Sequence, residues 1–249
     1  MPAWSLKAGG AAAAEWFNLR FQRARGLIPA ADFDTIIGED FAQTITSELV
    51  DVVGVASADP VDFYNGGVVA VAVGDPVVTP SSARFQATMP PSHVGDLTGK
   101  SWYAASLVRV IRPPDDELGA TAVDALGLWG DAANRIGLGI FNGSGGSTSN
   151  WVGYATADSS TTTVLGPLLG SSESPVWQLF EAWFNVGTGA LRFAIDGLNF
   201  ADAIDVDDMP GFPAHWAMTI ERSAVGNQAI PQFDKVCVVV ASPRIGEAD

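Results

Sequence analysis

The sequence is poor in the side chains that perform metal and nucleophilic chemistry. Cys237 is the single cysteine, which excludes an intramolecular disulfide and a multi-cysteine metal site. The apolar residues 236–240 around it predict that the thiol is buried. The two histidines, His93 and His215, lie far apart in the sequence, and no G-x-S-x-G, H-x-x-x-H or phosphate-loop motif is present. We therefore expect structural or solvent-facing roles for both histidines.

Basic residues are also scarce. The chain has 13 Lys and Arg residues against 28 Asp and Glu residues, a net charge of −15 at pH 7. This charge repels nucleic acid and anionic lipid, so the sequence predicts no nucleic-acid partner and no membrane partner.

Long hydrophobic runs are missing too. No apolar run approaches the roughly 20 residues needed to cross a bilayer. Residues 1–17 contain Lys7 as their one basic residue and a weakly hydrophobic Ala run, which is not typical of a secretory signal. We therefore expect the chain to stay inside the cell that makes it, unless processing removed a segment.

Apolar residues and turn formers are abundant. Hydrophobic residues make up 47% of the chain, which also has 27 glycines and 15 prolines. That content is enough for a large core, and it favours short strands joined by many turns over long helices. The composition therefore predicts an all-β sandwich.

The stretch 176–200 carries the clearest strand pattern. Phe180, Ala182 and Phe184 share one face of an extended strand, and Glu181 and Asn185 share the other. This alternation predicts a strand with one buried face.

A meander continues from that strand. Gly187-Thr188-Gly189 predicts a loop with positive φ, and residues 190–195 alternate as a second strand. Asp196-Gly197 predicts a type I′ turn into a third strand that begins at Leu198. Three such strands form the nucleus of a sheet.

Strand patterns recur at regular intervals from residue 60 onward. Besides the meander, the predicted strands are 67–73, 83–89, 101–111, 125–130, 135–142, 150–155, 161–165, 215–222 and 233–241. Their spacing fits a two-sheet antiparallel sandwich. The predicted domains are an N-terminal arm or attachment segment, 1–59, and a sandwich, 60–249.

Three segments resemble a known family. DLTGKSWYAASLVRV (96–110), VW followed by FEAWFNVGTGALRFAIDG (176–197) and FDKV (233–236) resemble strands of concanavalin A-like lectin/glucanase domains, especially the laminin-G-like branch. They occur in the family's order, and the resemblance covers about residues 60–242. It implies a jelly-roll sandwich and by itself implies no activity.

The N-terminal 59 residues fit this pattern less well. Residues 16–23 alternate as a strand or extended arm would, which we favour, although the spacing over 11–25 also suits a helix. Residues 41–53 carry one apolar stripe that predicts a helix. The segment also supplies our candidates for assembly contacts, which are Trp4, Trp16, Phe17, Phe21, Arg20 and Arg23.

Arg20, Arg23 and Arg25 lie close together in an acidic chain. Such a cluster favours contact with an acidic protein surface, and a solvated edge is the alternative.

The acidic residues do not form the pattern of a hydrolase. Glucanases of the family that the chain resembles carry E-x-D-x-E or E-x-D-x-x-E on one strand, because retaining hydrolysis needs two carboxyls about 5–5.5 Å apart. Here Glu48 and Asp51 are three apart, Glu181 is alone on its strand, and 115–117 lie in a Pro-flanked loop. We therefore expect a protein that is not an enzyme.

The densest acidic cluster consists of Asp202, Asp205, Asp207 and Asp208. Calcium takes oxygen ligands from such loops, which makes a site at Asp205, Asp207 and Asp208 one interpretation. Alternation with Ile204 and Val206 favours a solvated strand edge instead. We expect no cofactor and no metal.

Aromatic residues next to polar loops suggest a sugar site. Trp129 near Asp131 and Asn134 is one candidate, and Trp151 with Tyr154 beside the 142–150 loop is the other. Core packing is the alternative for each ring. The candidate glycan-binding residues are Trp129, Trp151, Tyr154, Asn142 and Asn150.

Three functional hypotheses follow. The first is a non-enzymatic interaction module, a capsid decoration or tail component of a bacteriophage virion that is assembled in the host cytoplasm. Its N-terminal arm would bind other virion proteins, and we expect a homo-oligomer, a trimer by analogy with virion parts. The alternatives are a glycan-binding, lectin-like module and a glycoside hydrolase.

Overall fold

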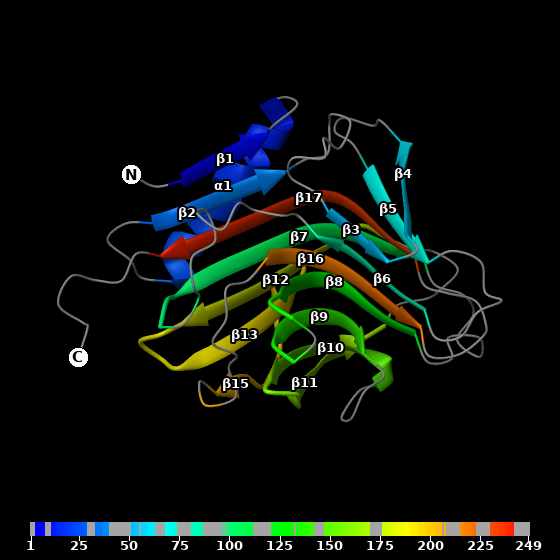
Figure 1. The fold of residues 1–249 in the computed structure, drawn as a ribbon. Coiled ribbons are helices and arrows are strands. Elements are labelled where there is room, and N and C mark those ends of the chain that lie inside the picture. Colours follow the sequence, from blue (N-terminus) through cyan, green and yellow to red (C-terminus); the bar gives the residue numbers. More distant parts are fainter. Residues whose placement is uncertain are drawn as a thin grey trace.

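The structure is a computed structural model of the 249-residue chain. It describes residues 3–7, 11–28, 33–39, 51–54, 56–62, 68–73, 81–86, 97, 99–111, 121–131, 133–141, 147–169, 176–205, 207, 215–222 and 230–241. These residues form two stacked β-sheets and a helix, α1 (Ala11–Leu27) (Figure 1).

The larger sheet has ten strands in the described residues. Its main path runs β1-β2-β17-β7-β12-β13-β14, with β15 beside β13, β5 beside β17 and β4 beside β5. These strands are β1 (Ala3–Lys7), β2 (Phe33–Glu39), β4 (Ala56–Asp62), β5 (Val68–Val73), β7 (Trp102–Ile111), β12 (Gln178–Asn185), β13 (Ala190–Ile195), β14 (Leu198–Asn199), β15 (Ile204–Asp205) and β17 (Ile230–Ala241). Neighbouring strands are antiparallel except β1 and β2, which are parallel.

The smaller sheet has seven strands in the order β11-β10-β9-β8-β16-β6-β3, all antiparallel within the described residues. They are β3 (Asp51–Gly54), β6 (Ser81–Gln86), β8 (Thr121–Trp129), β9 (Arg135–Phe141), β10 (Ser147–Ala157), β11 (Ser160–Leu168) and β16 (His215–Arg222). The predicted all-β, two-sheet antiparallel jelly-roll sandwich is confirmed. Each strand predicted from residue 67 onward coincides, to within one residue at its ends, with a strand over its described residues, and residues 67, 87–89 and 142 of those predictions lie outside the described part of the chain.

The central meander has the predicted geometry. β12 pairs with β13, and β13 pairs with β14 across the Asp196-Gly197 turn. Asp196 and Gly197 have φ of 51° and 79°, the positive values that a type I′ turn requires, and Gly189 has φ of 62° in the preceding loop. The alternation in β12 directs Phe180, Ala182 and Phe184 into the core between the sheets.

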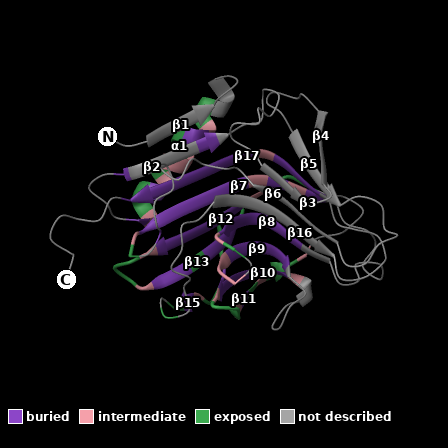
Figure 2. Ribbon diagram, in the orientation of Figure 1, coloured by how far each residue is buried: buried purple, intermediate pink, exposed green. Residues whose placement is uncertain are grey.

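Figure 2 shows buried residues along strands of both sheets, and contacts between side chains and glycines show that the core between the sheets is closely packed. Gly153 of β10 lies against the ring of Phe193 of β13, and a Cβ at Gly153 would be 2.5 Å from the nearest ring atom. Gly166 of β11 receives the ring of Phe200 in the same way. Each glycine makes room for an aromatic ring from the opposite layer, from β13 or from the residue after β14, which brings the two layers close together.

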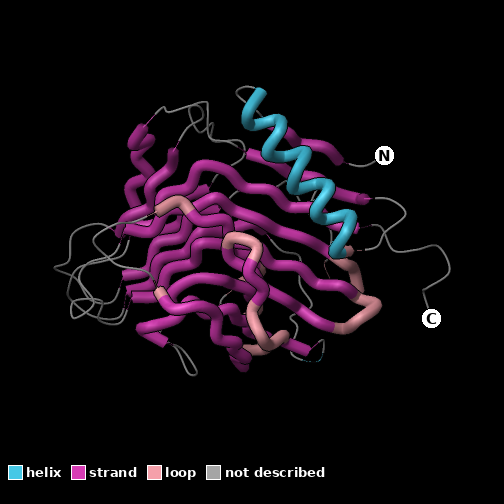
Figure 3. Tube along the Cα trace, turned by 180° about the vertical axis from the view of Figure 1, so that it is seen from behind, coloured by secondary structure: helices cyan, strands magenta, loops and turns pink. Residues whose placement is uncertain are grey.

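The strand or arm predicted for residues 16–23 is wrong, because these residues belong to α1. Phe17, Ala24 and Ile28 are spaced at helical intervals and are buried against the outer face of the larger sheet. Residues 16–23 therefore follow the helical spacing, which the preceding Ala run supports. The helix covers the apolar outer face of the larger sheet. Figure 3 shows α1 lying across the larger sheet.

Two other N-terminal predictions also change. Asp51–Gly54 form strand β3, so the helix predicted over 41–53 is wrong at residues 51–53, where Val52 and Val53 favour a strand. Residues 41–50 lie outside the described part of the chain. The predicted domain boundary between residues 59 and 60 falls inside β4, and strands on both sides of it belong to the same two sheets.

Candidate functional site

The outer face of the smaller sheet, away from the core, gathers polar and aromatic residues from three strands. Trp129 of β8 pairs with Arg135 of β9, which pairs with Thr156 of β10. Because residues directly opposite each other in an antiparallel pair share a face, these three positions form one row across the sheet. His215 of β16 occupies the register position on the other side of Trp129.

The next row places Tyr154 above two glycines. Gly127 pairs with Gly137, and Gly137 pairs with Tyr154. A Cβ at Gly137 would be 2.4 Å from the Tyr154 ring, so the ring lies directly on the Gly137 backbone. Its hydroxyl group donates to the buried Asp124 carboxylate, 2.8 Å from Oδ1 and 2.9 Å from Oδ2.

Arg135 links the two aromatic residues of this face. Its guanidinium lies 5.2 Å from the centroid of the Trp129 ring and 5.6 Å from that of the Tyr154 ring. Cation–π contacts of this kind hold a planar guanidinium in place. Arg135 itself is half-buried, while Trp129 is 9% and Tyr154 is 2% exposed. Arg135 is thus the most exposed of these three residues.

Two turns lie beside this row. Asn134 Nδ2 donates to both carboxylate oxygens of Asp131, and the backbone N–H of Asp158 donates to Asn134 Oδ1 at 3.3 Å. The backbone N–H of Ser159 donates to the carbonyl oxygen of Ala133 at 3.0 Å. The structure therefore places Asp131 and Asn134 in one hydrogen-bonded pair that immediately follows Trp129.

The structure separates the predicted glycan-binding residues. Trp129 and Tyr154 lie together on the outer face, whereas Trp151 is 4% exposed in the core, with its ring edge-on to Phe180 at 4.9 Å. Asn150 donates from Nδ2 to the Gly166 carbonyl oxygen at 2.9 Å. Asn142 lies outside the described residues.

Sequence reasoning missed Asp124 and Arg135 as members of this face. The alternation of β8 and β9 carries the signal, because Arg135 precedes three inward-facing apolar positions, Ile136, Leu138 and Ile140. A bulge between Asp124 and Leu126 breaks the alternation in β8 and obscures the position of Asp124.

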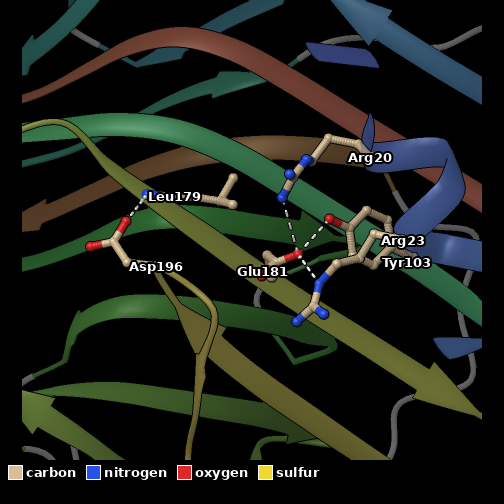
Figure 4. Close-up of polar contacts among 6 residues, drawn as sticks. All are labelled: Arg20, Arg23, Tyr103, Leu179, Glu181 and Asp196. Atoms are coloured by element: carbon tan, nitrogen blue, oxygen red, sulfur yellow. Dashed lines mark hydrogen bonds and ion pairs between the residues drawn. The ribbon is translucent and has the colours of Figure 1, made fainter. Parts of the chain in front are cut away.

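A second polar cluster lies between α1 and the larger sheet (Figure 4). Glu181 of β12 has no exposed side-chain surface. Its Oε1 accepts hydrogen bonds from Tyr103 Oη at 2.7 Å, Arg23 Nε at 2.8 Å and Arg20 Nη1 at 3.4 Å. The burial cost of this carboxylate is offset by two guanidinium charges and a hydroxyl donor, so the cluster joins α1 to the sheet.

The predicted assembly-contact residues belong mainly to this region. Phe17 of α1 is buried against the larger sheet, and Trp16 and Phe21 are half-buried. Arg20 and Arg23 form ion pairs with Glu181 of the same chain. Trp4 belongs to β1, and its side chain lies outside the described part of the structure.

Two titratable groups are buried beside Glu181. Burial raises the pKa of the Cys237 thiol to about 12 from an ordinary 9.0, although the nearby Arg20 opposes the shift. Burial, followed by the Glu181 charge and hydrogen bond, raises the pKa of Tyr103 well above 10.0. Both groups are therefore neutral in the folded protein at neutral pH, and the predicted burial of Cys237 is confirmed.

These shifts predict a loss of stability in alkali. The Cys237 thiol ionises near pH 9.0 in the unfolded chain but only near pH 12 in the folded protein. Its contribution to the free energy of unfolding is therefore complete below pH 9.0 and decreases as the pH rises from 9.0 towards 12. For Cys237 the free energy of unfolding should fall by about 1.4 kcal/mol between about pH 8 and pH 10. Over the same pH interval, we expect the free energy of unfolding of Cys237→Ala, measured in urea, to fall by about 1.4 kcal/mol less than that of the wild type. Equal losses in the two proteins would contradict the assignment.

The alternative interpretation of a calcium site at Asp205, Asp207 and Asp208 falls only partly within the described residues. Asp202, Asp205 and Asp207 are exposed, and Asp208 lies outside the described residues. Among the residues that the structure describes, no three His, Cys, Asp or Glu side chains are grouped so that they could hold a metal ion.

Within the described residues, no helix has the length and apolar character of a membrane span.

Solved structures share the fold of this chain. An endo-1,3-β-glucanase from Streptomyces sioyaensis is 10% identical, with a TM-score of 0.56 over 86% of this chain and 99% of the enzyme. A protein of unknown function from Shewanella oneidensis MR-1 is 14% identical, with a TM-score of 0.56 over 94% of this chain and 96% of that chain. A carbohydrate esterase from the Shiga toxin-encoding bacteriophage phi24B is 12% identical, with a TM-score of 0.50 over 82% and 97% of the two chains.

These likenesses confirm the fold that the sequence resemblance implied. The chain has the jelly-roll sandwich fold that these solved structures share. At 10–14% identity the likeness concerns the fold and not the activity. The chain matches no protein-family model and no curated protein.

Proposed function

We propose that this protein is a non-enzymatic β-sandwich module that binds glycans through the outer face of its smaller sheet. The observation that carries the proposal is Arg135, a partly exposed residue whose guanidinium lies against both the Trp129 and the Tyr154 rings. Guanidinium groups donate several hydrogen bonds in a fixed plane, which suits the hydroxyl groups of a sugar. The Asp131–Asn134 pair supplies further polar groups beside this row.

The positions of the buried carboxylates favour binding over hydrolysis. Glycosidases need two carboxyl groups about 5–5.5 Å apart for retention or about 6.5–9.5 Å apart for inversion. Asp124 and Glu181, the two buried carboxylates of the described residues, lie on the outer faces of different sheets. Each also accepts a hydrogen bond from a tyrosine, Tyr154 or Tyr103. Neither is placed to cooperate with the other in cleaving a glycosidic bond.

A glycan array with matched variants tests the binding proposal. We expect the wild type to bind a defined set of glycans and Arg135→Ala to lower the signal about tenfold, because one guanidinium contact is lost. Arg25→Ala, which removes an exposed arginine on α1, should leave the signal unchanged. Equal signals for Arg135→Ala and the wild type would contradict the site, and release of reducing sugar from a bound glycan would contradict the non-enzymatic role.

We further propose that the module is a structural component of a bacteriophage virion, a capsid decoration or tail protein that forms homo-oligomers and is assembled in the host cytoplasm. Its support is an acidic sandwich whose helix α1 presents Leu19, 53% exposed, and three arginines beside the outer face of the larger sheet. Virion proteins and surface glycans would then be its partners. Mass spectrometry of purified particles should detect the chain in stoichiometric amounts, and its absence from them would contradict this role.

A further inference from the structure

We propose that a basic ledge on the larger sheet docks an acidic polypeptide segment of a partner protein. The basic ledge consists of Arg20 and Arg23 on the flank of α1 and Arg192 on β13. The inference rests on the proposed role as an interaction module, and it names the chemistry of the partner at a surface that is separate from the proposed glycan face.

Strand register brings the three arginines together. Trp183 of β12 pairs with Arg192 of β13, and Glu181 pairs with Ala194. Residues opposite each other in an antiparallel pair share a face, so Arg192 lies on the same outer face as Glu181, about 7 Å further along the strand. Since Arg20 and Arg23 reach Glu181 from α1, one cationic surface includes the helix flank and the sheet.

Glu181 does not use the full donor capacity of these arginines. Its hydrogen bonds all arrive at Oε1, and Arg23 contributes through Nε. Figure 4 shows the two terminal nitrogens of Arg23 directed away from Glu181. The Arg23 side chain is 35% exposed and Arg192 is exposed, so both guanidinium groups can be reached from solvent. A terminal guanidinium fork binds a carboxylate through two parallel hydrogen bonds.

The charge balance favours an acidic partner. Asp205 pairs with Ala190 on the same face and is the acid closest to Arg192 by register among the described residues. Asp196, which accepts from the backbone N–H of Leu179, is a third acid at the edge of this surface. Three arginines therefore face three carboxylates, a balance of 3 − 3 = 0, whereas the whole chain carries −15. A surface that presents the exposed guanidinium groups of Arg23 and Arg192 on a strongly acidic protein repels an acidic partner less than the rest of the chain does and orients it there.

Apolar residues border the same surface. Trp16 and Leu27 on α1 and Leu179 on β12 are partly buried hydrophobic residues that pack against the cluster beneath the helix. The Arg20 guanidinium lies 5.8 Å from the centroid of the Trp16 ring. Apolar contacts beside cationic donors fit a polypeptide segment that combines carboxylates with apolar side chains, and they offer little to a bare inorganic anion.

The test measures binding of fluorescein-labelled decaglutamate to the full chain by fluorescence anisotropy. At about 50 mM salt we expect saturable binding that disappears at about 500 mM, because exposed charges are screened. Arg192→Ala should weaken binding about fivefold, since one guanidinium–carboxylate contact is lost. Arg25→Ala is the matched control, because it removes the same charge from the side of α1 where Arg25 lies over Phe21. It should change the affinity by less than about twofold.

Several outcomes would overturn the proposal. Equal losses for Arg192→Ala and Arg25→Ala would mean that only net charge matters. A thymidylate oligonucleotide of equal length that binds as tightly as decaglutamate, or a complete lack of decaglutamate binding, would also refute it. Because the glycan face lies on the other sheet, Arg192→Ala should leave the glycan-array pattern intact. The failure of one proposal can therefore be told apart from the failure of the other.

Discussion

Glu181→Gln should lower the free energy of unfolding by about 3 kcal/mol. The substitution keeps the shape of the side chain but removes the charge that Arg20 and Arg23 share, and breaking a buried ion pair on one side costs about 3–5 kcal/mol. We expect the lower end of this range because the Arg23 side chain, 35% exposed, can be rehydrated by solvent. Urea unfolding followed by tryptophan fluorescence measures the change.

Two further variants show whether the charge is responsible. Tyr103→Phe removes a single donor to Glu181 and should cost about 1.5–3 kcal/mol, as for other hydrogen bonds to charged groups. Glu15→Gln removes an exposed charge from the same helix and should change stability by less than about 0.5 kcal/mol. A Glu181→Gln variant as stable as the wild type would mean that α1 is held by its apolar contacts alone.

Gly153→Ala should also lower the free energy of unfolding by about 3 kcal/mol, at the upper end of overpacking costs. The added Cβ would lie 2.5–2.7 Å from three atoms of the Phe193 ring, which is fully buried. The backbone at Gly153 cannot easily shift, because it is paired with β9 on one side and with β11 on the other. Either the ring leaves its preferred rotamer or the two sheets move apart.

A double-mutant cycle isolates the contact. Once Phe193→Leu has removed the ring, adding Gly153→Ala should cost much less than it does in the wild type. Gly26→Ala is the control, since a Cβ there meets nothing within 4 Å, and it should stabilise α1 by about 0.5–1 kcal/mol. Additive effects of Gly153→Ala and Phe193→Leu would contradict the steric explanation.

The alternation in 176–200 was sufficient to predict the centre of the fold. A period of two residues assigns each side chain of β12 to one face, and the Asp196-Gly197 pair specifies its turn whatever the rest of the chain does. Local sequence was ambiguous for residues 16–23, where strand and helix spacings overlap. Burial of Phe17 and Ala24 against the sheet decides in favour of the helix, and no local pattern contains that contact.

The polar clusters could not be predicted from the sequence for the same reason: their residues meet only in the tertiary structure. Glu181 is alone on its strand in the sequence, and its partner Arg23 lies 158 residues away. Arg192 joins Arg20 and Arg23 only through the pairing of β12 with β13 and the docking of α1. In the same way, Arg135 meets both Trp129 and Tyr154 because three strands align in register.

By itself, the sequence determined the layered β architecture, its central meander and the burial of Cys237, because strand alternation and turn preference act over a few neighbouring residues. Only the tertiary structure decided that α1 covers the larger sheet and which charged side chains meet there. Those contacts join residues far apart in the chain, and they form only when the burial of apolar surface brings their strands and helix together.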